Sequence, residues 1–262
     1  MSVETLRDKW RRSGINPGDS VLLHSNIGRT VIDHSRQLGY QVKPEHVLDS
    51  FLETLGPAGT LILPLFNFDF TKGTPFDIHN TPSQMGILTE IARTRKGAVR
   101  TGHPVYSFVA IGANAHLFIG LNNRSAYSED SPFGLLKTIN GKIAILDLPD
   151  SQSMTFYHHI EEINKVDYRY FKSFTGKYTD HNGTTTDQTY LIFVRDLERG
   201  VVSHADPAEE LLWNQGLYTG YRPHDDTGLR VINALEMFEF ITSLIKSNQA
   251  RHYLYDIKKE SI

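Results

Sequence analysis

The sequence contains no cysteine among its 262 residues. This absence excludes a disulfide framework, a thiolate zinc site and a cysteine nucleophile. A basic stripe is also missing, and the formal net charge of −3 at pH 7 argues against nucleic acid as a partner. No apolar run approaches the roughly 20 residues of a membrane-spanning helix. The N-terminal stretch MSVETLRDKWRRSG has no apolar segment typical of a secretory signal. We therefore expect a cytoplasmic protein without a membrane partner.

Helical patterns alternate with short apolar runs along the first 150 residues. Pro44 suits the first position of a helix with an apolar stripe, Gly56 suits its end, and the buried strand TLILP follows. The same order recurs where Ser131 caps a helix that precedes the strand KIAILDL. Such alternation predicts an α/β fold with a central, largely parallel sheet flanked by helices.

Further elements complete a single predicted domain over residues 1–262. Thr81 and Gln84 form a potential capping box for a helix that ends near Gly97. The Thr- and Tyr-rich segment 172–195 surrounds an Asn-Gly turn and predicts an added antiparallel hairpin in the C-terminal half. A final helix is predicted for residues 229–246, and no repeat or linker interrupts the chain.

The stretch TFYHHIEEIN, residues 155–164, places two histidines beside two glutamates. On a helix His158 can meet Glu161 or Glu162, and His159 can meet Glu162. A carboxylate bonded to one imidazole nitrogen fixes the tautomer and leaves the other nitrogen free to act as a base. Taken alone, these ten residues favour an exposed polar helix face. A metal site is less favoured because H-E-x-x-H is absent.

Other polar groups flank the predicted strands. His24, Ser25 and Asn26 follow one apolar run, whereas His103 and Ser107 stand at the start of another. Each has an ordinary structural interpretation when taken singly. Ligands in open α/β folds nevertheless bind beyond the carboxyl ends of the strands, where several of these groups would converge.

The blocks GDSVLLHSN, LGPAGTLILP, GILTEIART, RTGHPVYSFVAIG, SPFGLL, GKIAILDLP and TFYHHIEE, in this order, resemble the aminoglycoside 3-N-acetyltransferase family. The resemblance implies an acetyl-CoA-dependent N-acetyltransferase of α/β fold, an antibiotic-resistance activity in its best-known members, and a plausible homodimer. The family's H-x-x-E signature aligns with His158 and Glu161, which become the expected catalytic pair. His159 would have a supporting role toward the substrate.

The resemblance also implies which groups surround the thioester and the pantetheine arm of acetyl-CoA. The residues expected to contact this co-substrate are Ser25, His103, Ser107, Ser131 and Thr155.

Two departures from the family pattern concern the acceptor. Asp147 stands where relatives commonly have glycine and is expected to alter the acceptor pocket. The long segment 28–46 is a candidate lid or substrate loop. The acceptor is then an aminoglycoside or a nucleotide-linked amino sugar, and residues 168–172 and 218–222 offer aromatic and basic groups for the latter.

Two other functions fit the same pattern. One is a non-catalytic α/β protein that binds CoA or another small molecule. The second is a thioester hydrolase in which Ser25 would be the nucleophile, although no G-x-S-x-G elbow is present. Release of CoA that requires an added amine would distinguish the acetyltransferase from both.

Overall fold

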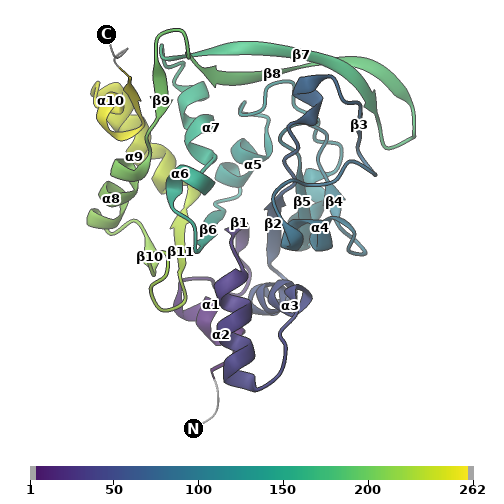
Figure 1. The fold of residues 1–262 in the computed structure, drawn as a ribbon, viewed down its shortest axis with the longest axis vertical. Helices are drawn as coiled ribbons and strands as arrows, with labels where there is room; N and C mark the ends of the chain where they lie inside the picture. Colours follow the sequence, from purple (N-terminus) through teal and green to yellow (C-terminus); the bar gives the residue numbers. More distant parts are fainter. Residues whose placement is uncertain (1–3, 259–262) are drawn as a thin grey trace.

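A mixed seven-stranded sheet forms the centre of the computed structural model, which describes residues 4–258 (Figure 1). The strand order is β10-β11-β6-β1-β2-β5-β4. The strands are β1 (Ser20–Ser25), β2 (Thr60–Pro64), β4 (Val99–Arg100), β5 (Phe108–Gly112), β6 (Lys142–Leu146), β10 (Thr219–Gly220) and β11 (Leu229–Asn233). The three central strands β6, β1 and β2 are parallel, and the outer four join antiparallel. The predicted α/β class is confirmed, with parallel pairing confined to the middle of the sheet.

Helices cover both faces of this sheet because its strands alternate apolar side chains between two cores. Val21 and Leu23 of β1 point into one core, whereas Leu22 points into the other. The first core is covered by α1 (Leu6–Arg12), α3 (Pro44–Leu55) and α4 (Ile87–Arg93). The second is covered by α5 (Pro132–Thr138), α7 (Phe156–Ile163) and α9 (Ala234–Lys246). None of the helices described within residues 4–258 is long and apolar enough to cross a membrane.

A long hairpin runs across the top of the molecule in Figure 1. Its strands β7 (Arg169–Thr179) and β8 (Thr185–Arg195) pair along their whole length, and β3 (Phe76–Asp77) adds a short parallel neighbour. Gly183 makes the turn with a φ of +77°, a conformation that glycine adopts without strain. The hairpin predicted for 172–195 is therefore confirmed and begins three residues earlier.

The remaining elements are short or peripheral. They are α2 (Gly28–Leu38), α6 (Asp150–Ser153), α8 (Asp206–Asn214), α10 (Ala250–Tyr253), the 3₁₀ turns η1 (Asp69–Lys72) and η2 (Ala113–Phe118), and the paired strands β9 (Val201–Ser203) and β12 (Tyr255–Ile257).

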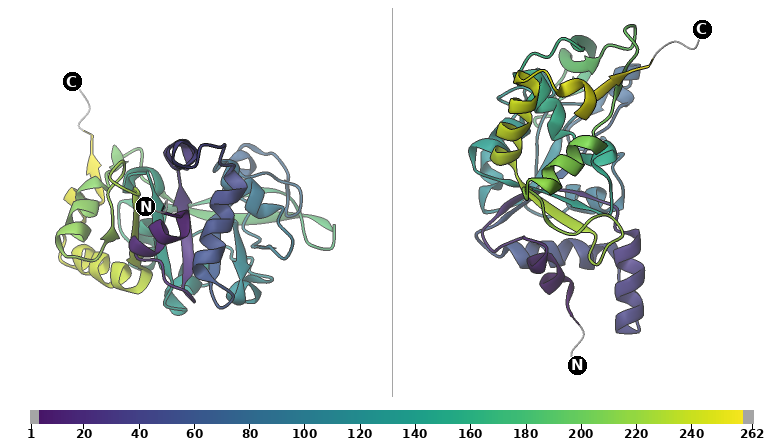
Figure 2. Two further views of the ribbon diagram at one scale, coloured as in Figure 1. Left: turned by 90° about the horizontal axis from the view of Figure 1, so that it is seen from below. Right: turned by 90° about the vertical axis from the view of Figure 1, so that its left-hand side faces the viewer.

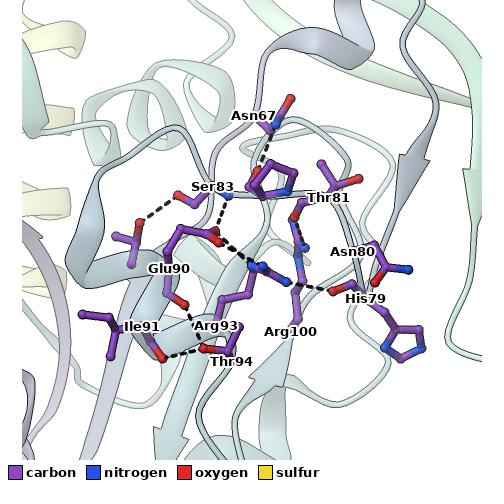
Figure 3. Close-up of polar contacts among 12 residues, drawn as sticks. Asn67, His79, Asn80, Thr81, Ser83, Glu90, Ile91, Arg93, Thr94 and Arg100 are labelled. Atoms are coloured by element: carbon purple, nitrogen blue, oxygen red, sulfur yellow. Dashed lines mark hydrogen bonds and ion pairs between the residues drawn. The ribbon is translucent and has the colours of Figure 1, made fainter. Parts of the chain in front are cut away.

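The capping box predicted at Thr81 and Gln84 is wrong. Helix α4 begins only at Ile87, after Gly86, so that the preceding residues form a loop. Side chains hold this loop in place (Figure 3). Arg93 donates to the carbonyl of His79, and Arg100 donates to the carbonyl of Thr81. Glu90 accepts from the amide of Ser83. These long-range bonds satisfy backbone groups that a helix would otherwise have paired.

One other predicted element is corrected at its start, and the secondary structure of a second predicted segment is defined. The helix predicted for 229–246 starts at Ala234, because residues 229–233 form β11 against β6, and Asn233 caps the helix by accepting from the amides of Leu235 and Glu236. The candidate lid at 28–46 is mainly helix α2, which projects from the body of the molecule in the right-hand view of Figure 2.

A buried ion pair fastens β11 to the segment after β6. Arg230 and Asp150 both have fully buried side chains, and their charged atoms lie 2.6 Å apart. Asp150 also accepts hydrogen bonds from the hydroxyls of Tyr157 and Tyr218. A buried carboxylate without a positive partner is costly, so the pairing with Arg230 stabilises this part of the fold.

We predict that Arg230→Ala lowers the free energy of unfolding by about 3–5 kcal/mol, because it leaves Asp150 buried without its positive partner. Arg199→Ala serves as the control: Arg199 is 46% exposed, and its loss should change stability by less than about 0.5 kcal/mol. Urea unfolding measures both values. Equal unfolding midpoints for the two variants would contradict the prediction.

Candidate active site

Two adjoining cavities lie beyond the carboxyl ends of the parallel strands. The central cavity, of about 440 Å³, is lined by His24 from the end of β1 and by Thr155, His158 and Glu161 around α7. The inner cavity, of about 600 Å³, reaches the ends of all three parallel strands through residues 24–28, Pro64 and Leu148. The two share four residues, namely His24, Met85, Gln152 and Ser153. Their position is the usual ligand-binding edge of an open α/β sheet.

A third cavity, of about 350 Å³, lies against one face of the β7–β8 hairpin, and we call it the hairpin cavity. Tyr170, Lys172 and Phe174 line it from alternate positions of β7, as expected for side chains on one face of a strand. His158 and Arg195 line both the central and the hairpin cavities. The His158 ring therefore stands where the two cavities meet.

The His158 ring is held by a buried carboxylate. Its Nδ1 lies 2.8 Å from Oε2 of Glu161, one helical turn further along α7. The same carboxylate pairs with Nε of Arg169 at 2.7 Å and accepts from the hydroxyl of Tyr168 at 3.0 Å. The His158 side chain is 27% exposed, whereas that of Glu161 is 2% exposed. An ionised carboxylate only accepts, so Nδ1 carries the hydrogen and Nε2 carries the free lone pair.

The charge states of the pair follow from their surroundings. Burial favours the protonated form of Glu161, but the charge of Arg169 and the hydrogen bonds from His158 and Tyr168 outweigh it and lower the pKa. Burial and the charge of Arg169 lower the pKa of His158 below its ordinary value, and Glu161 opposes them only in part. Near neutral pH the site thus holds a neutral imidazole beside a carboxylate.

The other pairings that the spacing left open do not form. His159 faces the opposite way, where its Nδ1 donates to the carbonyl of Tyr127 among aromatic rings. Burial lowers the pKa of His159 to about 4. Glu162 instead accepts from the hydroxyl of Ser125. His159 lines none of the three cavities, so its expected contact with the substrate is not supported by its position.

Two of the five residues expected to contact the cofactor line the cleft. Ser25 borders the inner cavity, and Thr155 borders the central cavity three residues before His158. Ser25 is the last residue of the parallel strand β1, and Thr155 lies between α6 and α7.

The structure does not bring the other three to the cleft. His103, Ser107 and Ser131 are fully buried and engaged by protein partners. The His103 ring accepts from backbone amides through Nδ1, and burial lowers its pKa to about 3. Ser107 accepts from the buried guanidinium of Arg100, and Ser131 caps α5 by accepting from the amide of Gly134.

Asp147 also lies outside the three cavities. Its carboxylate accepts two hydrogen bonds from Arg29 of α2, at 2.8 and 2.9 Å, and a third from the amide of His224. The residue adopts a φ of +51° at the end of β6. Asp147 therefore ties α2 and the loop before β11 to the sheet, and the expectation that it shapes an acceptor pocket is not supported by this position.

Of the two segments proposed for a nucleotide sugar, only the first reaches the cleft. Arg169, Tyr170 and Lys172 line the hairpin cavity. Tyr218 is instead buried against Asp150, and Arg222 pairs with Glu210 on the surface.

Two residues of the cleft, Arg169 and His24, had no individual role assigned to them from the sequence. Arg169 completes the setting of Glu161 but comes from β7, at no helical spacing from it. His24 lines two cavities, its Nε2 has no partner among the described residues, and burial lowers its pKa to about 4. The position of His24 at a strand end was visible in the sequence, whereas its orientation was not. Within residues 4–258, no group of three or more potential ligands is arranged to hold a metal ion.

Comparisons with known proteins identify relatives of the chain. The family model described as aminoglycoside 3-N-acetyltransferase matches residues 34–245. Aminoglycoside N(3)-acetyltransferase VIII of Streptomyces fradiae is 26% identical over 172 residues, which are 56% of this chain and 56% of the relative. Aminoglycoside N(3)-acetyltransferase VII of Streptomyces paromomycinus is 26% identical over 174 residues, with 57% and 56% covered. The matched part is thus just over half of each curated relative.

Solved structures agree over more of their length. Aminoglycoside acetyltransferase AAC(3)-Xa aligns with a TM-score of 0.75 and 24% identity, over 92% of this chain and 91% of its own. A binary complex of AAC-IIIb with CoASH aligns with a TM-score of 0.75 and 20% identity, over 93% and 95%. At these identities the structural similarity shows the fold.

We predict that His158 titrates below pH 6.5 and that Glu161→Gln lowers its pKa further. Burial and Arg169 act against the imidazolium, and the variant removes the one group that favours it. Histidine ring signals followed by NMR between pH 4 and 9 measure both values, with His158→Asn giving the assignment.

Glu162→Gln is the matched control, because Glu162 is adjacent in sequence but bonds to Ser125. Glu162→Gln should leave the pKa of His158 unchanged. A higher His158 pKa in Glu161→Gln than in the unmodified protein would contradict the account.

Proposed function

Because the chain belongs to the aminoglycoside 3-N-acetyltransferase family, we propose that it transfers an acetyl group from acetyl-CoA to an amino group of an amino sugar. The observation that carries this proposal is the neutral imidazole of His158, held by Glu161 where two cavities meet. Such an arrangement suits removal of a proton from a group in one cavity as it attacks a group in the other.

The inner and central cavities suit the pantetheine arm of acetyl-CoA. A pantetheine chain is narrow and uncharged, and its two amides need hydrogen-bonding partners along their path. The inner cavity has no charged lining residue and offers the side chains of Ser25, Asn26, Gln84 and Gln152. Gln152 belongs to both cavities, so an arm that follows these groups would end near Thr155 and His158. The hairpin cavity is then left for the acceptor amine.

In the proposed reaction the amine attacks the thioester carbonyl directly. Most amines are protonated at neutral pH. The ammonium group must first lose one proton to solvent, because only the neutral amine has a lone pair that can attack the thioester. As the nitrogen–carbon bond forms, Nε2 of His158 takes the remaining surplus proton from nitrogen. The carbon–sulfur bond then breaks, and the departing CoA sulfur takes the proton that His158 received, which returns the imidazole to its neutral form. Glu161 keeps the ring oriented and stabilises the imidazolium that forms.

A direct transfer is preferred over an acyl-enzyme route. The chain has no cysteine, and Ser25 makes no hydrogen bond to a histidine that would activate it within the described residues. A hydrolase would also need water in place of the amine in the hairpin cavity. The amine-dependent release of CoA therefore separates the proposal from both a hydrolase and a non-catalytic CoA-binding protein.

We predict that His158→Ala lowers kcat for acetyl transfer by about 10²–10⁴-fold, the usual contribution of a general base. The dissociation constant of acetyl-CoA should change little, because the ring adds no charge to the cleft. A steady-state assay of CoA release measures kcat, and calorimetric titration measures the dissociation constant of acetyl-CoA. His116→Ala is the control, since His116 is exposed and its Nδ1 meets only the carbonyl of Ala113.

Full activity of His158→Ala with its best acceptor would show that another group is the base. CoA release by the unmodified protein at the same rate with and without amine would show a hydrolase instead. Tight acetyl-CoA binding with no turnover on any amine would favour the binding protein.

A further inference from the structure

The hairpin cavity carries positive charge and no negative charge. Its lining includes Arg169, Lys172 and Arg195 but no aspartate or glutamate. Arg169 is neutralised by Glu161. Lys172 and Arg195 are exposed, and neither has an ion-pair partner among residues 4–258. Two uncompensated cations therefore face whatever occupies this cavity.

The rest of the cleft offers no free carboxylate either. Asp150 and Glu161 are the acidic residues that line the central cavity, and the inner cavity has none. Asp150 is paired with Arg230 and bonded to two tyrosine hydroxyls, while Glu161 is paired with Arg169. Both are already satisfied and deeply buried. An acceptor with several ammonium groups would meet Lys172 and Arg195 without a counter-charge, which opposes its binding.

We propose that the acceptor is an amino sugar that carries a phosphate group, bound by Lys172 and Arg195 in the hairpin cavity. This inference rests on the proposed function and specifies its acceptor. Arg195 and His158 both line the central and the hairpin cavities, so a phosphate bound by Arg195 would hold the acceptor in the part of the hairpin cavity that adjoins the base. Tyr170, which is 47% exposed, and Phe174 border the same cavity and give flat apolar surfaces for a sugar ring or a linked base.

The phosphates of CoA are a second source of the same negative charge. If the nucleotide end of the donor occupied the hairpin cavity, Lys172 and Arg195 would affect the donor and not the acceptor. S-acetylpantetheine distinguishes the two sources, because it keeps the thioester and lacks all of the nucleotide phosphates. An effect of the two cations on acceptor KM that persists with this donor belongs to the acceptor.

The test uses 2-, 3- and 4-amino hexoses, each as the free sugar, the 1-phosphate and the nucleotide diphosphate sugar, with sisomicin as the polycation. We expect the best phosphorylated acceptor to exceed its free sugar by about 10-fold or more in kcat/KM, the value of one hydrogen-bonded charge pair. The kcat/KM of this phosphorylated acceptor should exceed that of sisomicin by a larger factor than it exceeds that of the free sugar. Raising the salt concentration should reduce this preference.

Lys172→Ala and Arg195→Ala should each raise KM for the phosphorylated acceptor by about 10-fold, with acetyl-CoA or S-acetylpantetheine as donor. The effect on the matching free sugar should be several-fold smaller, and Lys172→Arg should restore most of the affinity. Lys177→Ala is the control on the same strand, because Lys177 pairs with Asp187 and lines none of the three cavities. It should have no effect.

Preference for sisomicin or for the free sugars would overturn the inference and leave the acetyltransferase proposal intact. The inference is also overturned if the variants raise KM for acetyl-CoA alone and have no effect with S-acetylpantetheine. Absence of amine-dependent CoA release with every acceptor would instead contradict the proposed function itself.

Discussion

A single buried carboxylate organises the functional end of this molecule. Glu161 is 2% exposed, and the charge of Arg169, 2.7 Å away, lowers its pKa together with hydrogen bonds from His158 and Tyr168. Once charged, it accepts from Nδ1 of His158 and leaves Nε2 toward the cleft. Loss of the arginine would favour a protonated glutamic acid, and the imidazole would lose both its fixed tautomer and its stabilising negative charge. The proposed chemistry therefore depends on Arg169 and Glu161, which act through the orientation and charge of the His158 ring.

The hairpin begins at the residue that pairs with Glu161. Arg169 is the first residue of β7, so the same strand that stabilises Glu161 continues outward to present Tyr170 and Lys172 to the hairpin cavity. On the far side, the parallel strands end at the inner and central cavities. His158 thus lies between cavities formed at the sheet and a cavity formed at the β7–β8 hairpin. In the proposed function the first hold acetyl-CoA and the second holds the acceptor amine.

Much of this arrangement could be predicted from the sequence where the signal is local. The cap at Ser131 followed from the sequence alone, whereas the i, i+3 spacing allowed the pair of His158 and Glu161 among other pairings and the family resemblance selected it. Contacts between distant segments were not predictable: Arg169, the tether from Asp147 to Arg29 and the burial of His103 depend on tertiary packing. The boundary at Asn233 was missed because β11 runs into α9 without a glycine or proline between them. Family resemblance supplied the reaction class, and only the charges lining the cavities bear on the acceptor.

The most direct measurement is a crystal structure of the protein with CoA and an unreactive analogue of the amino-sugar acceptor, in which a hydroxyl replaces the amine. We expect Nε2 of His158 about 2.6–3.2 Å from that hydroxyl, with the CoA sulfur in the central cavity on the opposite side of the hydroxyl. An acceptor hydroxyl bonded to another base, or a CoA sulfur remote from His158, would contradict the account.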